Sequence, residues 1–182
     1  MLLLNEVPKY ECLLEGAKRY PSLAPSAVEA FLHLLRTSTD LTAAFDAVHA
    51  SHQLSSGRFF VLLLLHRAER GPVTPADLAE RAGVTRATIT GLLDTLERDG
   101  LVRREDTPAD RRMMHVRLTA AGQGYIERVL PDYFRRISMA MSLLSEAEHH
   151  TLVRLVDKIA AAIPAIGADL LPWVASHAEP HG

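Results

Sequence analysis

The sequence predicts a mainly α-helical chain of the α+β class, and three observations support this prediction. Two short amphipathic stretches lie on either side of a glycine near the middle of the 182 residues. Two strand-like runs follow them, separated by a polar turn. Long stretches with apolar residues at helical spacing flank this central part. We therefore expect a small helix-turn-helix unit with a β-hairpin, set between long helices.

The N-terminal third predicts helices. Residues 10–20 are expected to form a short helix that ends before Pro21, and Ser26 is expected to cap a long helix reaching about His52. Residues 56–69 are apolar on nearly all sides, which is typical of a buried helix. The apolar residues of the long helix that we expect to face inward are Val28, Phe31, Leu35, Leu41, Phe45 and Val48.

Two short helices follow. Thr74 can cap the first, Pro75 suits its first position, and Asp77 is favourable at the positive helix end. Gly83 breaks this helix. Thr85 then caps a second helix that runs to Asp99 and is closed by Gly100. Its apolar residues form one stripe: Ile89, Leu92, Leu93 and Leu96.

A β-hairpin is predicted next. Residues 101–105 and 113–118 read as strands, and the polar turn 106–112 places Arg111 and Arg112 at its tip. Two helices around a turn, followed by a hairpin, form a winged helix-turn-helix, which sets its second helix in the DNA major groove. Arginines at the hairpin tip are then placed to reach phosphates or the minor groove. The alternative is a protein-binding α+β module whose arginines form a solvated rim.

The start of the second helix is the predicted DNA-recognition surface. Thr85 and Arg86 lie where phosphate contacts and the positive helix end coincide. Thr88 and Thr90 could read base edges or thymine methyl groups.

Long helices are predicted again after the hairpin. Thr119 starts a helix to about Leu144, which Pro131 should kink or loosen. Residues 145–148 form a capping box for a last long helix, 146–163. Pro164 and Pro172 interrupt the tail that follows, which could add one or two more helical turns. One chain has too little structure to cover all this apolar surface, so we expect a homodimer. The helical dimerisation region would comprise residues 1–54 and 119–182, and the winged module residues 55–118; the alternative is a monomeric bundle with a winged insert.

Composition limits the function classes. The formal net charge is −2, so the chain as a whole lacks the basic character common in nucleic-acid-binding proteins. Its cations are nevertheless 17 Arg and only 3 Lys, and Arg is the better partner for phosphate and guanine. A single cysteine excludes a disulfide framework. The longest apolar run, residues 59–65, is too short to cross a bilayer, so we expect a cytoplasmic protein without membrane contact. No nucleophile, phosphate-loop or dinucleotide motif indicates an enzyme or a cofactor.

Four segments resemble the MarR family of bacterial transcription regulators. They begin at Ala76 (ADLAERA), Val84 (VTRATIT), Leu92 (LLDTLERDGLV) and Asp110 (DRR, followed by VRLTAAG). The resemblance implies an obligate homodimer that binds double-stranded DNA at palindromic operators, usually a repressor released by a small ligand or by thiol oxidation. It also implies that Asp110, two positions before Arg112, orients that arginine in the wing. Gly91 departs from the family, in which many members have a larger polar or basic residue.

The effector site is the least specific prediction. The resemblance implies that ligand-responsive members bind aromatic carboxylates in a crevice beside the dimer helices. His33 and Arg36, one helical turn apart, could grip a carboxylate, and His66 is a further candidate. A salt bridge and a satisfied core histidine are the alternative.

Cysteine and histidine offer two other chemistries. Neighbouring acids disfavour a reactive thiolate at Cys12, so an inert, packed thiol is preferred over a redox sensor. The histidines lack the spacing of a zinc motif, so no metal is expected. The family resemblance keeps a zinc sensor as the alternative. Surface positions are expected for His49, His52, His149 and His150.

Overall fold

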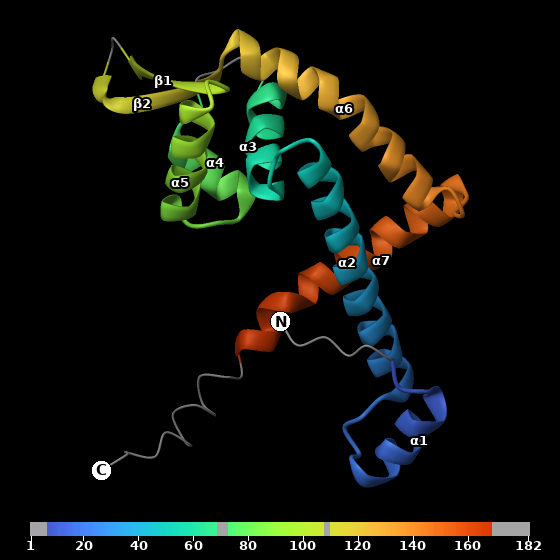
Figure 1. Cartoon of the computed structure of the whole chain (residues 1–182). Coiled ribbons are helices and arrows are strands. Elements are labelled where there is room, and N and C mark those ends of the chain that lie inside the picture. Colours follow the sequence, from blue (N-terminus) through green and yellow to red (C-terminus); the bar gives the residue numbers. More distant parts are fainter. Residues whose placement is uncertain (1–6, 69–72, 108–109, 169–182) are drawn as a thin grey trace, which may run out of the picture. The chain divides into compact units, whose positions relative to one another are not determined.

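The computed structural model describes residues 7–68, 73–107 and 110–168 (Figure 1). The chain divides into two compact units, residues 1–130 and 131–182. The elements in chain order are α1 (Tyr10–Arg19), α2 (Pro25–Ser51), α3 (Ser56–Arg67), α4 (Pro75–Ala82), α5 (Arg86–Arg98), β1 (Val102–Thr107), β2 (Asp110–Leu118), α6 (Ala120–Met141) and α7 (Glu146–Ala168). The mainly helical fold with a two-stranded wing is therefore confirmed.

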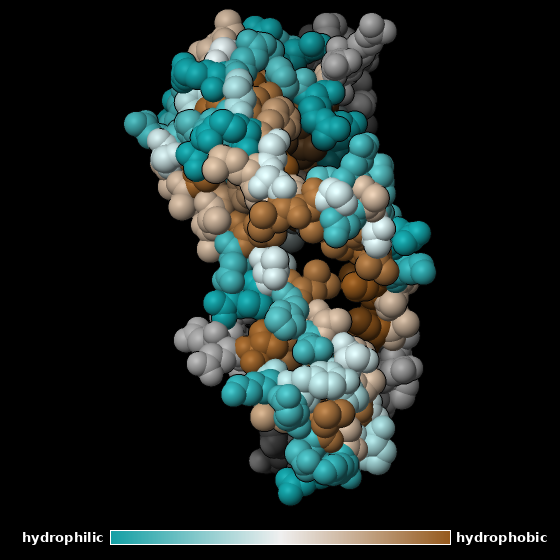
Figure 2. All heavy atoms as spheres, turned by 90° about the vertical axis from the view of Figure 1, so that its right-hand side faces the viewer, coloured by the Kyte–Doolittle hydropathy of each residue, from teal (hydrophilic) through white to brown (hydrophobic). Residues whose placement is uncertain are grey.

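The helix α2 differs from the prediction in its cap and its apolar face. Ala24, not Ser26, is the N-cap, because Pro25 takes the first helical turn and needs no hydrogen-bond partner for its nitrogen. The stripe expected to face inward is largely open in the single chain: Phe31 is 59% exposed and Leu41 is 41% exposed. Figure 2 shows hydrophobic residues, in brown, at the molecular surface among hydrophilic residues, in teal.

The junction between α2 and α3 is built around a histidine. His49 is only 1% exposed, so the surface position expected for it is wrong. Its ring stacks on Phe59 at 4.3 Å between centroids, and its Nδ1 lies 2.7 Å from Oγ of Ser56. Ser56 in turn donates to Asp46. The helix α3 buries Phe59, Val61, Leu62 and Leu65, but Phe60 is 44% exposed, so the helix expected to be buried is buried on one side only.

The helix-turn-helix forms as predicted. Thr74 accepts a hydrogen bond from the Asp77 amide at 3.1 Å, and the Asp77 carboxylate accepts one from the Thr74 amide at 2.9 Å. Those bonds hold the pKa of Asp77 below its usual value, the backbone bond first. Gly83 ends α4 with φ +64°, a conformation that favours glycine. Most of the apolar face of the pair is buried, with 0% exposure at Leu78, Ile89, Leu93 and Leu96, whereas Leu92 of the predicted stripe is half-buried.

The hairpin is longer than predicted. Antiparallel pairing runs from Val102 opposite Leu118 to Thr107 opposite Asp110. Backbone pairing thus continues into the segment expected to be a turn, and Arg111 and Arg112 belong to β2 rather than to the tip. The side chains of residues 106–113 lie outside the described part of the structure. In Figure 1 the hairpin lies beside α5, and β1 contacts that helix.

The start of α6 fits closely against the end of the helix-turn-helix. Oγ1 of Thr119 accepts from the Gly122 amide at 3.0 Å and donates to the Gly100 carbonyl at 2.7 Å. A Cβ on Gly122 would lie 1.9 Å from the carbonyl oxygen of Leu101, so this position requires glycine. The helix continues through Pro131, which does not end it, and stops at Met141, before the predicted end at Leu144.

Residues 131–182 form the second unit, which contains α7. Ser145 and Glu148 form the predicted capping box, with the Ser145 amide 2.8 Å from Oε2 of Glu148. The helix runs through Pro164 to Ala168, so the residues after 163 add the further helical turn that the sequence allowed. Pro172 lies outside the described residues. Within the described residues, none of the helices is both long and apolar enough to span a membrane.

Candidate nucleic-acid interface

The first turns of α5 present a polar surface. Thr85, Arg86, Thr88 and Thr90 are all exposed, whereas Ile89 on the opposite side of the helix is completely buried. The structure thus brings together the four residues that the sequence predicted for α5. Because the unpaired amides of a helix start carry partial positive charge, this surface favours an anion such as phosphate.

The threonine hydroxyls have defined partners. Oγ1 of Thr85 accepts from the Thr88 amide at 3.2 Å and lies 2.9 Å from Oγ1 of Thr88. The Thr90 hydroxyl donates to the Arg86 carbonyl at 2.9 Å. With its proton engaged by the backbone, Thr90 offers its methyl group and an oxygen lone pair. That combination suits contact with a thymine methyl group better than donation to a base.

A charged clamp, Arg104 with Asp94 and Glu97, fastens the hairpin to α5. Arg104 of β1 donates to Oε2 of Glu97 at 2.7 Å and to Oδ1 of Asp94 at 2.5 Å. Its backbone amide donates to the other Glu97 oxygen at 3.0 Å. These partners, Asp94 first, raise the pKa of Arg104. The clamp holds the wing against α5, the predicted DNA-recognition helix.

Sequence reasoning missed this clamp and a second ion pair. Arg58 of α3 donates to Asp99 at the end of α5, which ties α3 to the predicted DNA-recognition helix. The second pair joins residues 41 positions apart, and the clamp joins β1 to the helix before it, so both depend on how these elements pack against each other. The one available signal was the presence of acids at Asp94 and Glu97, one helical turn apart, on a helix expected to meet DNA.

For the predicted wing residues, the structure describes the backbone only. Asp110, Arg111 and Arg112 begin β2, and their side chains lie outside the described part of the chain. Nearer the root of the hairpin, Glu105 lies between two arginines, 2.7 Å from Nη2 of Arg103 and 3.0 Å from Nε of Arg117.

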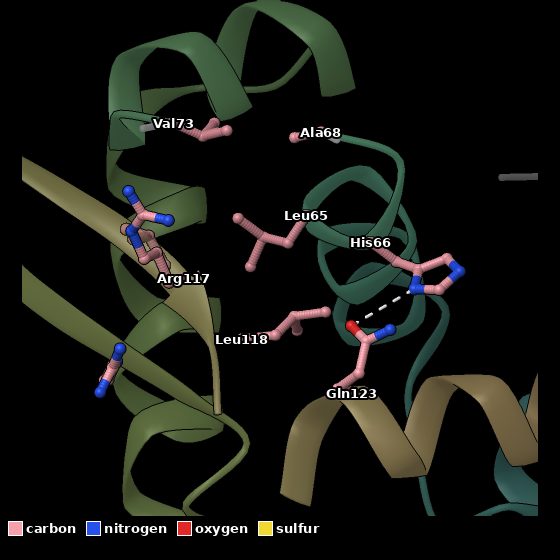
Figure 3. A pocket seen from close by; sticks show the side chains of 9 residues that line it. Leu65, His66, Ala68, Val73, Arg117, Leu118 and Gln123 are labelled. Atoms are coloured by element: carbon pink, nitrogen blue, oxygen red, sulfur yellow. Dashed lines mark hydrogen bonds between the residues drawn. The ribbon is translucent and has the colours of Figure 1, made fainter. Parts of the chain in front are cut away.

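The predicted effector residues lie on different helices. His33 is exposed on α2, and Arg36 pairs with Asp40 at 2.7 Å, the salt bridge that was the alternative for this residue. His66, near the end of α3, has Nδ1 3.5 Å from Oε1 of Gln123 on α6 (Figure 3).

The cysteine and the remaining histidines also have clear environments. Cys12 is exposed in the single chain, so the expected packed thiol is wrong; its helix α1 buries Leu13 instead. His52 and His149 are half-buried, and only His150 of the four histidines is fully on the surface. The described residues contain no cluster of His, Cys, Asp and Glu suited to a metal ion.

Comparison with known proteins agrees with this geometry. A MarR family model matches residues 52–113. The HTH-type transcriptional repressor YetL of Bacillus subtilis is 37% identical over 153 residues, which cover 84% of this chain and 92% of YetL. The chain belongs to the MarR family. The repressor NicR of Pseudomonas putida is 30% identical over 149 residues, which cover 78% of this chain and 93% of NicR.

Solved structures support the same assignment. The transcriptional repressor CouR, bound to a 23-mer DNA duplex, aligns with a TM-score of 0.63 at 28% identity, over 71% of this chain and 90% of CouR. The Staphylococcus aureus MepR–DNA complex aligns with a TM-score of 0.66 at 20% identity, over 72% and 94% of the two chains, which is a likeness of fold. The protein is thus a DNA-binding transcriptional repressor of the MarR family, and this is a family of regulators, not of enzymes.

Proposed function

We propose that this MarR-family protein is a homodimer that represses transcription from palindromic operators and is released by a small organic ligand. The observation that carries the DNA-binding part is the polar face of α5, where four exposed Thr and Arg side chains surround a helix start. The repressor CouR, which was solved on a 23-mer DNA duplex, supports DNA binding by this chain.

Each residue of the interface has a proposed role. Thr85 and Arg86 contact phosphates at the helix start, and Thr88 and Thr90 contact bases in the major groove. Arg111 and Arg112 reach the minor groove from β2, with Asp110 orienting Arg112.

The dimer follows from apolar surface that the single chain leaves open. Phe31 and Leu41 of α2 and Val153 and Ile163 of α7 are all at least 41% exposed. Pairing residues 1–54 and 119–182 of two chains would bury such faces, whereas the winged module, residues 55–118, already has its own core. Two modules related by a twofold axis would then match the two halves of a palindrome.

The DNA-binding proposal is tested on genomic fragments selected by the protein. Operator affinity is measured by fluorescence anisotropy over a range of salt concentrations. Arg112→Ala should weaken binding to operator and nonspecific DNA alike and make the salt slope less steep by about 0.9 for each lost phosphate contact. Thr88→Ala should mainly reduce the preference for operator over nonspecific DNA. Arg154→Ala, on α7, is the control; Arg112→Ala binding like this control contradicts the wing assignment.

The effector proposal is tested with aromatic acids, screened for their ability to release the operator. Proposed ligand residues are His33, Arg36 and His66, and Arg36→Ala should abolish release if α2 grips the carboxylate. Asp40→Ala is the matched control, since it breaks the same ion pair while keeping the guanidinium. The exposed thiol of Cys12 keeps the redox alternative available. Operator release by peroxide in wild type, but not in Cys12→Ser, would replace the small ligand with thiol oxidation.

A further inference from the structure

Gly91 lies in the middle of α5, at a position where the single chain does not require a glycine. Among the glycines that the structure describes, a positive φ occurs at Gly83 and Gly100 but not at Gly91, so its backbone is one that any residue adopts. A Cβ added to Gly91 would meet no described atom within 4 Å. Because glycine inside a helix is less favourable than alanine, this residue lowers the stability of α5 with no gain in packing within the chain.

The gap that Gly91 leaves on the helix surface faces away from the core of the module. Gly91 is exposed, whereas Ile89 is completely buried. Two residues on from Ile89, Gly91 lies about 160° around the helix from it. The exposed Thr88 and Thr90 lie on its two flanks. The gap is therefore at the centre of the surface of α5 that is proposed to contact DNA.

The side chains around this gap offer methyl groups rather than hydroxyl groups. The neighbours of Gly91 on the helix surface, three or four positions away, are Ala87, Thr88, Asp94 and Thr95. Oγ1 of Thr88 lies 2.9 Å from Oγ1 of Thr85, and the Thr95 hydroxyl donates to the Gly91 carbonyl at 3.0 Å. Since both hydroxyls have partners within α5 or its cap, the methyl groups of the two threonines are left for a partner outside the chain.

The charge beside the gap is compensated. Asp94 is the one ionised residue among the four neighbours, and its carboxylate accepts from Nη2 of Arg104 at 2.5 Å. A phosphate or a guanine is normally bound by an Arg or Lys side chain, and none of the four neighbours provides one. In the major groove, the group that suits a neutral recess with methyl groups at its edge is the C5-methyl group of thymine.

We propose that Gly91 admits the C5-methyl group of one thymine in each half of the operator, and so makes α5 specific for thymine at that position. The missing Cβ lets the backbone of α5 approach the base edge closely, and the methyl group contacts Ala87, Thr88 and Thr95. A side chain at residue 91 would hold the helix farther from the floor of the groove. This inference rests on the proposed repressor function and names the base that its recognition helix selects.

The experiment removes or adds one methyl group on each partner. Uracil, which is thymine without its C5-methyl group, replaces each thymine of a selected operator in turn, in both half-sites. The affinity of the intact protein for each DNA is measured by fluorescence anisotropy with wild type, Gly91→Ala and Gly124→Ala. Gly124→Ala is the matched control, because it also adds a methyl group to a helical glycine in open space.

At one thymine of each half-site, uracil should weaken wild-type binding about fourfold for each methyl group removed, as expected when one buried methyl group is lost. Gly91→Ala should bind the thymine operator about tenfold more weakly than wild type. The same uracil should strengthen binding by Gly91→Ala, because it removes the group that the new Cβ meets. Gly124→Ala should behave like wild type on every DNA. The proposal is overturned if Gly91→Ala binds the thymine operator as tightly as wild type, or if every uracil changes the affinity of both proteins equally.

Thermal unfolding separates a contact with DNA from a structural role of Gly91. Both alanine variants should melt about 1–4 °C higher than wild type, as expected when a helical glycine is replaced by alanine. A higher melting temperature together with weaker operator binding assigns the glycine to DNA. A lower melting temperature of Gly91→Ala assigns it to the packing of the protein and overturns the proposal. Wild type that binds the operator no better than nonspecific DNA contradicts the proposed function itself, and this inference with it.

Discussion

The winged module buries its apolar side chains within one chain, whereas the long terminal helix α7 leaves its apolar side chains exposed. In the module, Leu78, Ile89 and Leu93 are completely buried within one chain. In α7, Val153 is 60% exposed and Ile163 is 58% exposed, and no described residue of this helix is buried. Both regions are amphipathic helices by sequence, so the difference does not lie in local pattern. It lies in whether the same chain supplies the surface that covers the apolar face.

The stability of the module therefore comes from one chain, whereas the stability of the terminal helices depends on a second chain. The module is held by its own core, its caps and its clamp, so its structure is set within one chain. Full burial of a Leu or Ile side chain contributes about 1.5–3 kcal/mol, and the half-exposed Leu and Ile side chains of α7 forgo a corresponding part of it. A second copy of the chain can recover that free energy, which links the fold of the terminal helices to protein concentration.

The largest expected effect is therefore on the dimer. Ile159→Glu places a charge on the apolar face of α7, where Ile159 is 49% exposed in the single chain. We expect a monomer by sedimentation velocity at micromolar concentration, with operator affinity reduced by about 100-fold or more because the two half-sites are no longer bound together. Lys158→Ala, one residue earlier on the same helix, is the control. Dimers as stable as wild type in Ile159→Glu would remove α7 from the interface.

The second prediction concerns the internal packing of the module. Gly122→Ala should destabilise the protein by about 2 kcal/mol or more, because the added Cβ would meet the Leu101 carbonyl. Gly124→Ala, two residues later in α6, has nothing within 4 Å of the added Cβ. That control should be neutral or stabilising by about 0.5–1 kcal/mol, as for glycine replaced inside a helix. Thermal or urea unfolding followed by circular dichroism measures both; equal effects would contradict the close approach at residue 122.

These two regions also show what the sequence could and could not predict. The caps at Thr74, Thr85 and Ser145 were predictable because each is a local arrangement of a few residues. Burial of His49 was not, since it depends on Phe59 from another helix. The clamp at Arg104 depends on the register of β1 against α5, and the exposure of the α2 stripe depends on a surface outside the single chain. Local signals predicted elements well, whereas interactions between elements needed the structure.

A smaller effect is expected at the clamp between α5 and β1. Glu97→Gln removes a negative charge near the proposed DNA surface, which by charge alone should strengthen binding. If the clamp positions the wing, operator binding should instead weaken by about fivefold, or about 1 kcal/mol, since these groups are partly exposed. Glu80→Gln, an exposed acid of α4, removes the same charge outside the clamp and should bind DNA slightly better. Tighter binding by both variants would show that Glu97 has only an electrostatic effect.

The smallest expected effect is a pH dependence at the junction of α2 and α3. Burial is the main cause that lowers the pKa of His49 from 6.5; nearby His52 lowers it too, and Asp46 opposes them. A lowered folded pKa means that the unfolded chain takes up a proton first as the pH falls. The stability due to neutral His49 is therefore fully present above about pH 6.5 and is lost as the pH falls toward the lower folded value. Urea unfolding at about pH 7.5 and about pH 5.5 should show a larger loss in wild type than in His49→Gln, with His150→Gln, a surface variant, behaving like wild type. An identical loss in all three proteins would assign the pH dependence to other groups.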